Sequence, residues 1–246
     1  MLGSLSLALF GFLLGVRHAI DPDHVVAVTA IATQQLSQQP SQQLFQQPSQ
    51  QLSQQPSQQR SQQPGWRRAT IIGALWGIGH TVTVMSVGGA IVLFRVAISP
   101  RVGLVFEFAV ALMLILLGVM NLLGSRATLP AAPPATPSHA RPLVVGMMHG
   151  LAGSAAIALL VLATVSDSRW ALAYLLLFGV GTVVGMMLVT TLIALPATLA
   201  SHHVVGMRRW LTVASGAVSV VFGLMLAREL SGPGGLFSAA PQWIPR

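Results

Sequence analysis

A group of ligand-type side chains lies near the N-terminus of this 246-residue chain, within positions 17–24. His18, Asp21, Asp23 and His24 offer imidazole nitrogens and carboxylate oxygens, a donor set that suits Ni(II), Co(II), Cu(II) or Zn(II). The chain has no Cys, so any metal must be held by donors of this kind. In a continuous helix, His18, Asp21 and His24 would fall within about 120° of one face, and Asp23 would point elsewhere.

The group is embedded in an apolar run, Leu5–Ala32. Each charged side chain costs about 2.5–3.5 kcal/mol at the centre of a membrane helix, and a cost of this size indicates a function. Pro22 predicts a kink or an opening, because it lacks an N–H and clashes with the carbonyl of His18. An opening would bring Asp23 inward. The structural alternative is a polar stretch that is solvated at a membrane surface.

Two further histidines lie within apolar runs. His80 follows Gly79, and His149 precedes Gly150; such small neighbours let helices approach closely. Each imidazole is therefore a candidate ligand from another helix, or alternatively a helix-to-helix hydrogen bond. The candidate metal ligands are His18, Asp21, Asp23, His24, His80 and His149.

The composition indicates a membrane protein, so membrane helices must position these residues. Apolar residues make up 53% of the chain and charged residues only 7%, with a mean hydropathy of +0.72. A soluble domain would have roughly a quarter charged residues, so a water-exposed globule is excluded. The net charge of +8 comes from scattered Arg residues that flank apolar runs, which argues against a nucleic-acid partner.

Six runs have the length of about 20 residues that crosses a bilayer. They are Leu5–Ala32, Ala69–Phe94, Val102–Leu123, Leu143–Val165, Trp170–Leu199 and Trp210–Leu230. We therefore expect an all-α polytopic membrane protein with about six transmembrane helices.

The chain divides into six segments along its length. Residues 37–64 are seven tetrapeptides rich in Gln, Ser and Pro, a composition that predicts a disordered insertion. Residues 129–142 are rich in Ala and Pro and indicate a linker. The other segments are 1–36 with the first helix and the metal motif, 65–128 with helices two and three, 143–231 with helices four to six, and the C-terminal tail 232–246.

The two halves resemble each other. Gly15-Val16-Arg17-His18 matches Gly146-Met147-Met148-His149, Trp76-Gly77-Ile78-Gly79 matches Phe178-Gly179-Val180-Gly181, and Leu117-Gly118-Val119-Met120 matches Phe222-Gly223-Leu224-Met225. The matched segments are separated by 131, 102 and 105 residues, and the 28-residue insertion accounts for nearly all of the difference. Repeats of three helices must cross the membrane in opposite orientations, which predicts two inverted three-helix repeats, as in secondary transporters.

At these residues the chain resembles the nickel/cobalt transporter superfamily. Residues 17–25 look like that family's signature of a His, four residues, an Asp and a His, although Pro22 stands where the family commonly has Ala. Residues 79–84 look like its second motif, Gly-His-Ser/Thr. Residues 148–154 are similar to the shorter, six-span, urease-accessory-like branch of nickel permeases. The resemblance implies metal-site roles for His18, Asp21, Asp23, His24 and His80, with nickel or cobalt as substrate.

We therefore expect a permease of the bacterial inner (cytoplasmic) membrane rather than an enzyme, with no prosthetic cofactor. Its expected partners are the lipid bilayer and a divalent ion, Ni(II) or Co(II). One alternative is a structural or assembly subunit that keeps the transporter scaffold within a larger membrane complex. Another is a cytochrome with His18, His80 and His149 as haem ligands, in which Asp21 and Asp23 would have no role.

Overall fold

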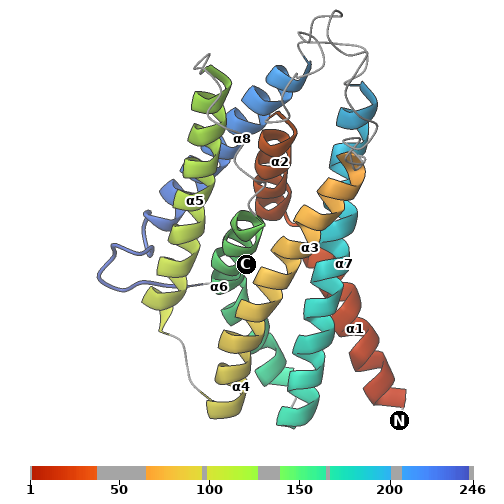
Figure 1. The fold of residues 1–246 in the computed structure, drawn as a ribbon. Coiled ribbons are helices and arrows are strands. Elements are labelled where there is room, and N and C mark those ends of the chain that lie inside the picture. Colours follow the sequence, from red (N-terminus) through yellow and green to blue (C-terminus); the bar gives the residue numbers. More distant parts are fainter. Residues whose placement is uncertain are drawn as a thin grey trace, which may run out of the picture.

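The computed structural model describes residues 2–37, 65–95, 99–126, 139–164, 167–200 and 207–243 (Figure 1). The predicted linker lies largely outside these residues, as does the predicted insertion beyond Ser37. The described part of the chain is helical apart from short connections and a C-terminal segment. Its helices are α1 (Leu2–His18), α2 (Pro22–Ser37), α3 (Gly65–Thr83), the π-helix η2 (Val84–Gly88), α4 (Gly89–Phe94), α5 (Pro100–Arg126), α6 (Ala140–Thr164), α7 (Ser168–Ala200) and α8 (Met207–Leu230).

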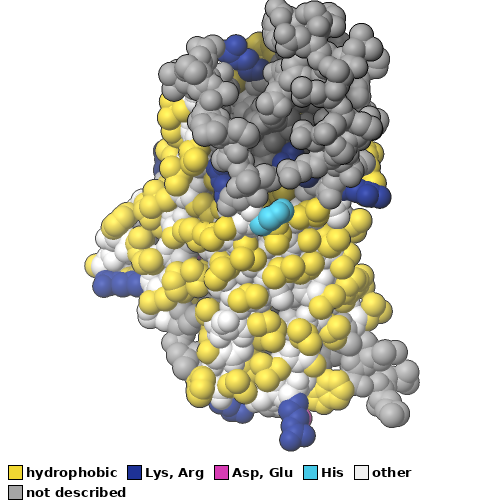
Figure 2. Space-filling view, viewed as in Figure 1, with side chains coloured by type: hydrophobic (Ala, Val, Ile, Leu, Met, Phe, Trp, Pro, Cys, Tyr) yellow, Lys and Arg dark blue, Asp and Glu magenta, His cyan; other side chains and the backbone are white. Residues whose placement is uncertain are grey.

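Four long apolar helical segments can cross a membrane, which confirms an all-α membrane protein. They are Gly65–Phe94, Pro100–Gly124, Ser168–Leu195 and Arg209–Leu230, and they correspond to the second, third, fifth and sixth predicted spans. The fourth predicted span corresponds to α6, and the first is divided between α1 and α2. Figure 2 shows hydrophobic side chains over most of the visible face, between arginines near its top and bottom.

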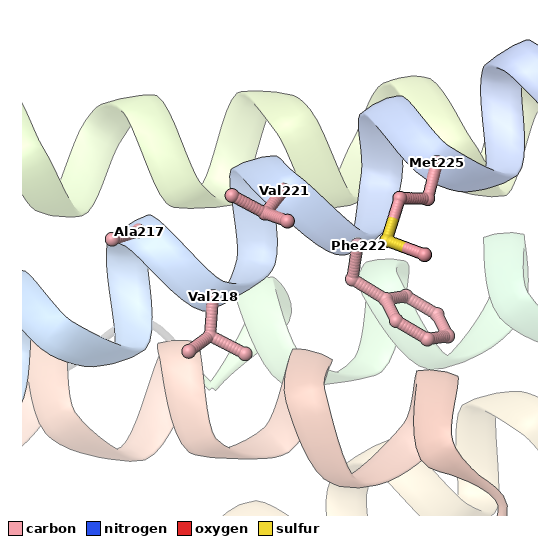
Figure 3. A pocket seen from close by; sticks show the side chains of 5 residues that line it. All are labelled: Ala217, Val218, Val221, Phe222 and Met225. Carbon is pink, nitrogen blue, oxygen red and sulfur yellow. The ribbon is translucent and has the colours of Figure 1, made fainter.

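The outward side of α8 illustrates this apolar surface. A shallow groove there is lined by Ala217, Val218, Val221, Phe222 and Met225 (Figure 3). All of these side chains are apolar, as a surface in contact with lipid requires.

The first predicted span breaks before Pro22, as the proline predicts. The N–H of Asp21 bonds to the carbonyl of His18 (3.1 Å) and closes a tight turn, because Pro22 has no N–H to continue the helix. α2 then begins at Pro22, a residue favoured at the first helical position, and has Asp23 in its first turn. Figure 1 shows α1 and α2 running on opposite sides of this break.

Glycines let the helices pack backbone against backbone. A Cβ on Gly15 would overlap the carbonyl of Phe178, which brings α1 onto α7. A Cβ on Gly146 would likewise overlap the carbonyl of Trp76, which brings α6 onto α3. Two more overlaps of this kind are those of Gly79 with Leu143 and of Gly181 with Phe12. The same helix pairs, together with α3·α7 and α5·α8, make the most extensive contacts of the fold.

Buried polar side chains join helices on the other side of the bundle. Asn121 of α5 donates from Nδ2 to the carbonyl of Ala30 in α2 (2.8 Å), and Ser219 of α8 donates to the carbonyl of Leu114 in α5 (2.7 Å). The hydroxyls of Thr33 and Ser215 bond across α2 and α8 (2.8 Å). Bonds of this kind are the usual polar connection between membrane helices.

The C-terminal segment folds back onto α5. The indole N–H of Trp243 donates to Oε1 of Glu107 (2.8 Å), and the rings of Phe237 and Phe108 meet edge to face with centroids 6.0 Å apart. Glu107, which is buried, thus has a hydrogen-bond donor inside an apolar helix.

The second predicted span also departs from a regular helix. The π-helix η2 interrupts it between α3 and α4, beginning four residues after His80. A π-turn in a long helix is rare and occurs mostly near functional sites.

The glycine contacts predict the effect of a single added methyl group. In Gly146→Ala the new Cβ meets the Trp76 backbone, so we expect a loss of about 1–3 kcal/mol in the free energy of unfolding. The control is Gly124→Ala in α5, where no atom of another described helix lies within 4 Å of the added atom. The free energies of unfolding of the two variants would be measured on protein purified in detergent and compared. Equal stability of both variants would contradict the described packing of α6 on α3.

Candidate metal centre

The predicted ligands come together at the break between α1 and α2. His18 ends α1, Asp21 lies in the turn, and Asp23 and His24 begin α2. His80 reaches the same place from α3, and His149 reaches it from α6. The helices α3 and α6 can lie this close because Gly150 has no side chain. A Cβ at this position would clash with the carbonyl of His80.

The cluster is buried at three of its imidazoles and partly exposed at its carboxylates. His24, His80 and His149 are at most 2% exposed. The side chains of His18, Asp23 and Asp21 are 14%, 33% and 38% exposed, in that order. The two carboxylates are therefore the most exposed members of the cluster.

Asp21 orients His18. Nδ1 of His18 donates to Oδ2 of Asp21 (2.8 Å), since an ionised carboxylate can only accept. In the neutral ring, which a metal requires, the proton is then on Nδ1 and Nε2 has a free lone pair. This Nε2 is buried and has no partner among the described residues.

Asp23 connects two further histidines. Its Oδ1 accepts from Nδ1 of His24 (3.2 Å) and from the backbone N–H of the same residue (3.0 Å). Its Oδ2 accepts from Nε2 of His149 (2.9 Å), which joins α2 to α6. The remaining ring nitrogens, Nε2 of His24 and Nδ1 of His149, are buried and have no partner in the described part of the chain.

His80 is the most isolated of the four imidazoles. It is fully buried, and neither of its ring nitrogens has a hydrogen-bond partner within the described ranges. Its ring centroid lies 5.2 Å from that of His18 and 5.4 Å from that of His24. A buried nitrogen without a partner costs free energy, so nitrogens arranged in this way indicate a ligand.

Two overlapping groups have the geometry to hold a metal ion. His18, His24 and His80 form one, and Asp23, His24 and His149 form the other, with ligand atoms within 4.8 Å of one another in each group. Asp21 belongs to neither group and instead holds the ring of His18. A carboxylate that fixes a ligating histidine from behind is a common feature of metal sites.

Two aromatic residues that the ligand pattern did not indicate also line the cluster. The ring of Phe178 in α7 lies 5.3 Å from His18, and that of Trp76 in α3 lies 5.8 Å from His149. Both are fully buried and exclude water from the imidazoles. The only feature of the sequence that pointed to Trp76 and Phe178 is that they occupy matched positions in the two halves.

The fold and the cluster together define an integral membrane protein with metal-ligand side chains buried between its helices. The chain is 32% identical over 253 residues to the urease accessory protein UreH of Bacillus sp. (strain TB-90), across 98% of this chain and 97% of that protein. It belongs to the UreH family, which confirms the resemblance to the urease-accessory-like branch. No protein-family profile matches the chain. No solved structure matches it either.

Because the ring nitrogens of His80 have no hydrogen-bond partner among the described residues, replacing this side chain with an apolar one should stabilise the ion-free protein. Met is adaptable in shape and has no N–H to satisfy, so His80→Met should raise the free energy of unfolding by about 1–3 kcal/mol. Unfolding would be followed in detergent with a chelator present. The control is His139→Met, at an exposed position just before α6. Unchanged or lower stability of His80→Met would mean that the imidazole is already satisfied.

Proposed function

We propose that this protein is a permease that carries a divalent transition-metal ion, nickel or cobalt, across the membrane. The observation that carries the proposal is the set of buried ring nitrogens of His18, His24 and His80, which converge without partners among the described residues. Neutral imidazoles with nearby carboxylates suit these ions, and both carboxylates offset part of the ion's charge. The resemblance to nickel/cobalt transporters and the name of the relative, a urease accessory protein, favour nickel.

We further propose that the chain forms six transmembrane spans in two inverted three-helix repeats. Equivalent positions make equivalent contacts: Gly15 meets Phe178 as Gly146 meets Trp76. The aromatic contacts follow the same rule, since Phe178 lies against His18 and Trp76 against His149. These paired contacts support a two-fold relation between the halves, with the histidine cluster where they meet. Transporters with this plan bind substrate near the midplane.

The first test is binding of Ni(II) by the detergent-purified chain. We expect saturable binding by the parent and loss of about 10- to 100-fold or more in affinity in His18→Ala, His24→Ala, because both remove ligands. The control is His139→Ala, which removes an exposed imidazole and should bind as the parent does. Isothermal titration calorimetry and metal analysis after gel filtration would measure the affinity and the ion content.

Transport is tested with the same proteins in liposomes that contain a nickel-sensitive dye. Uptake by the parent and by His139→Ala, with none by the double variant, is the expected result. A folded parent that binds no metal would contradict the proposal and favour a structural or assembly subunit of a membrane complex.

The ligand type also predicts an effect of protons. Imidazole must be neutral to bind a metal, so protons compete with the ion and binding should weaken as the pH is lowered. A pH gradient across the membrane would then drive or gate release. Uptake into proteoliposomes, measured at fixed membrane potential, should change when the gradient is collapsed. Unchanged uptake would show that transport is not coupled to the proton gradient.

A further inference from the structure

The two ligand groups share His24, and the chemistry of one imidazole decides how they can be used. Nδ1 of His24 donates to Asp23, so Nε2 is the nitrogen that this ring can offer to the group with His18 and His80. Asp23 and His149 lie instead on the Nδ1 side of the ring. A neutral imidazole has one lone-pair nitrogen at a time. His24 can therefore complete one group or the other, but not both together.

The two groups also differ in charge. The first consists of three imidazoles, whereas the second includes the carboxylate of Asp23. His149 now donates from Nε2 to that carboxylate, while its Nδ1 is buried without a partner in the described residues. For this group to bind a metal, the ring proton of His149 moves from Nε2 to Nδ1 and that of His24 moves from Nδ1 to Nε2, with no net gain or loss of protons.

His24 lies between the two histidines that the proposed repeat makes equivalent. Its ring centroid is 4.5 Å from that of His18 and 4.2 Å from that of His149. Neither ligand group contains both of these residues. Equivalent residues of an inverted repeat approach the midplane from opposite sides, so a step from His18 to His149 has a direction across the membrane.

We infer that a single ion occupies two alternative positions in turn, exchanging His18 and His80 for Asp23 and His149 while His24 serves both. The inference rests on the proposed function, and it assigns His149 to the onward transfer of the ion rather than to its first capture. Because His24 is shared, each chain holds one ion at a time.

The test separates capture from transfer in two variants of His149. His149→Ala removes the ligand, whereas His149→Gln keeps an N–H that can donate to Asp23. We expect both variants still to bind one Ni(II) per chain in calorimetry, because His18, His24 and His80 remain in place. Uptake into dye-loaded proteoliposomes should fall by about 10- to 100-fold or more in both, since loss of even an outer-shell partner of a metal ligand has an effect of this size. His139→Ala serves as the control, and gel filtration checks that each variant is folded.

Several results would overturn the inference. Parental uptake by His149→Ala would show that His149 is not used, and rescue by the Gln variant would show that it only positions Asp23. Loss of binding equal to that of His18→Ala, His24→Ala would mean one site that contains all the histidines. Two ions per parental chain would contradict the shared role of His24. Failure of the proposed function looks different, because the parent itself would then neither bind nor transport the ion.

Discussion

Pro22 has no N–H to offer the carbonyl of His18, and its ring would clash with that carbonyl in a regular helix, so the first helix breaks at this point. The chain closes a tight turn at Asp21 and starts a second helix. In a continuous helix, Asp23 would point away from His18 and His24. The break instead lets Asp23 contact His149 on α6, while Asp21 turns back onto His18. The arrangement of the metal centre depends on this one interruption.

A second constraint is the close approach of helices at glycines. His80 and His149 come from α3 and α6, and these two helices lie close together because Gly146 and Gly150 have no side chains to separate the backbones. The result is a cluster backed by Trp76 and Phe178, in which several ring nitrogens are buried and have no partner among the described residues. This burial makes the imidazoles costly without a ligand and would strengthen their interaction with an ion.

Much of this arrangement was predictable from residue chemistry. The break follows from the properties of proline, and His18, Asp23, His24 and His80 stand in a recognisable spacing. The inward position of Asp23 follows from the opening expected at Pro22. The role of Asp21 was not predictable, because both the helical projection and the family resemblance place it with the ligands rather than behind His18. Two other features depend on tertiary contacts without a local signature. They are the π-turn after His80 and the bond between Trp243 and Glu107.

If the proposed ion binds at the unpartnered nitrogens, the amount of protein in a membrane depends on the supply of that ion. A ligand that binds the folded state alone stabilises it in proportion to the logarithm of the free ligand concentration above the dissociation constant. Quality-control proteases act on the unfolded fraction, so a shift of one or two kcal/mol changes steady-state abundance several-fold. Cells short of the metal would then hold less of this protein without any change in its synthesis. The histidine cluster would thus act on the lifetime of the chain as well as on its cargo.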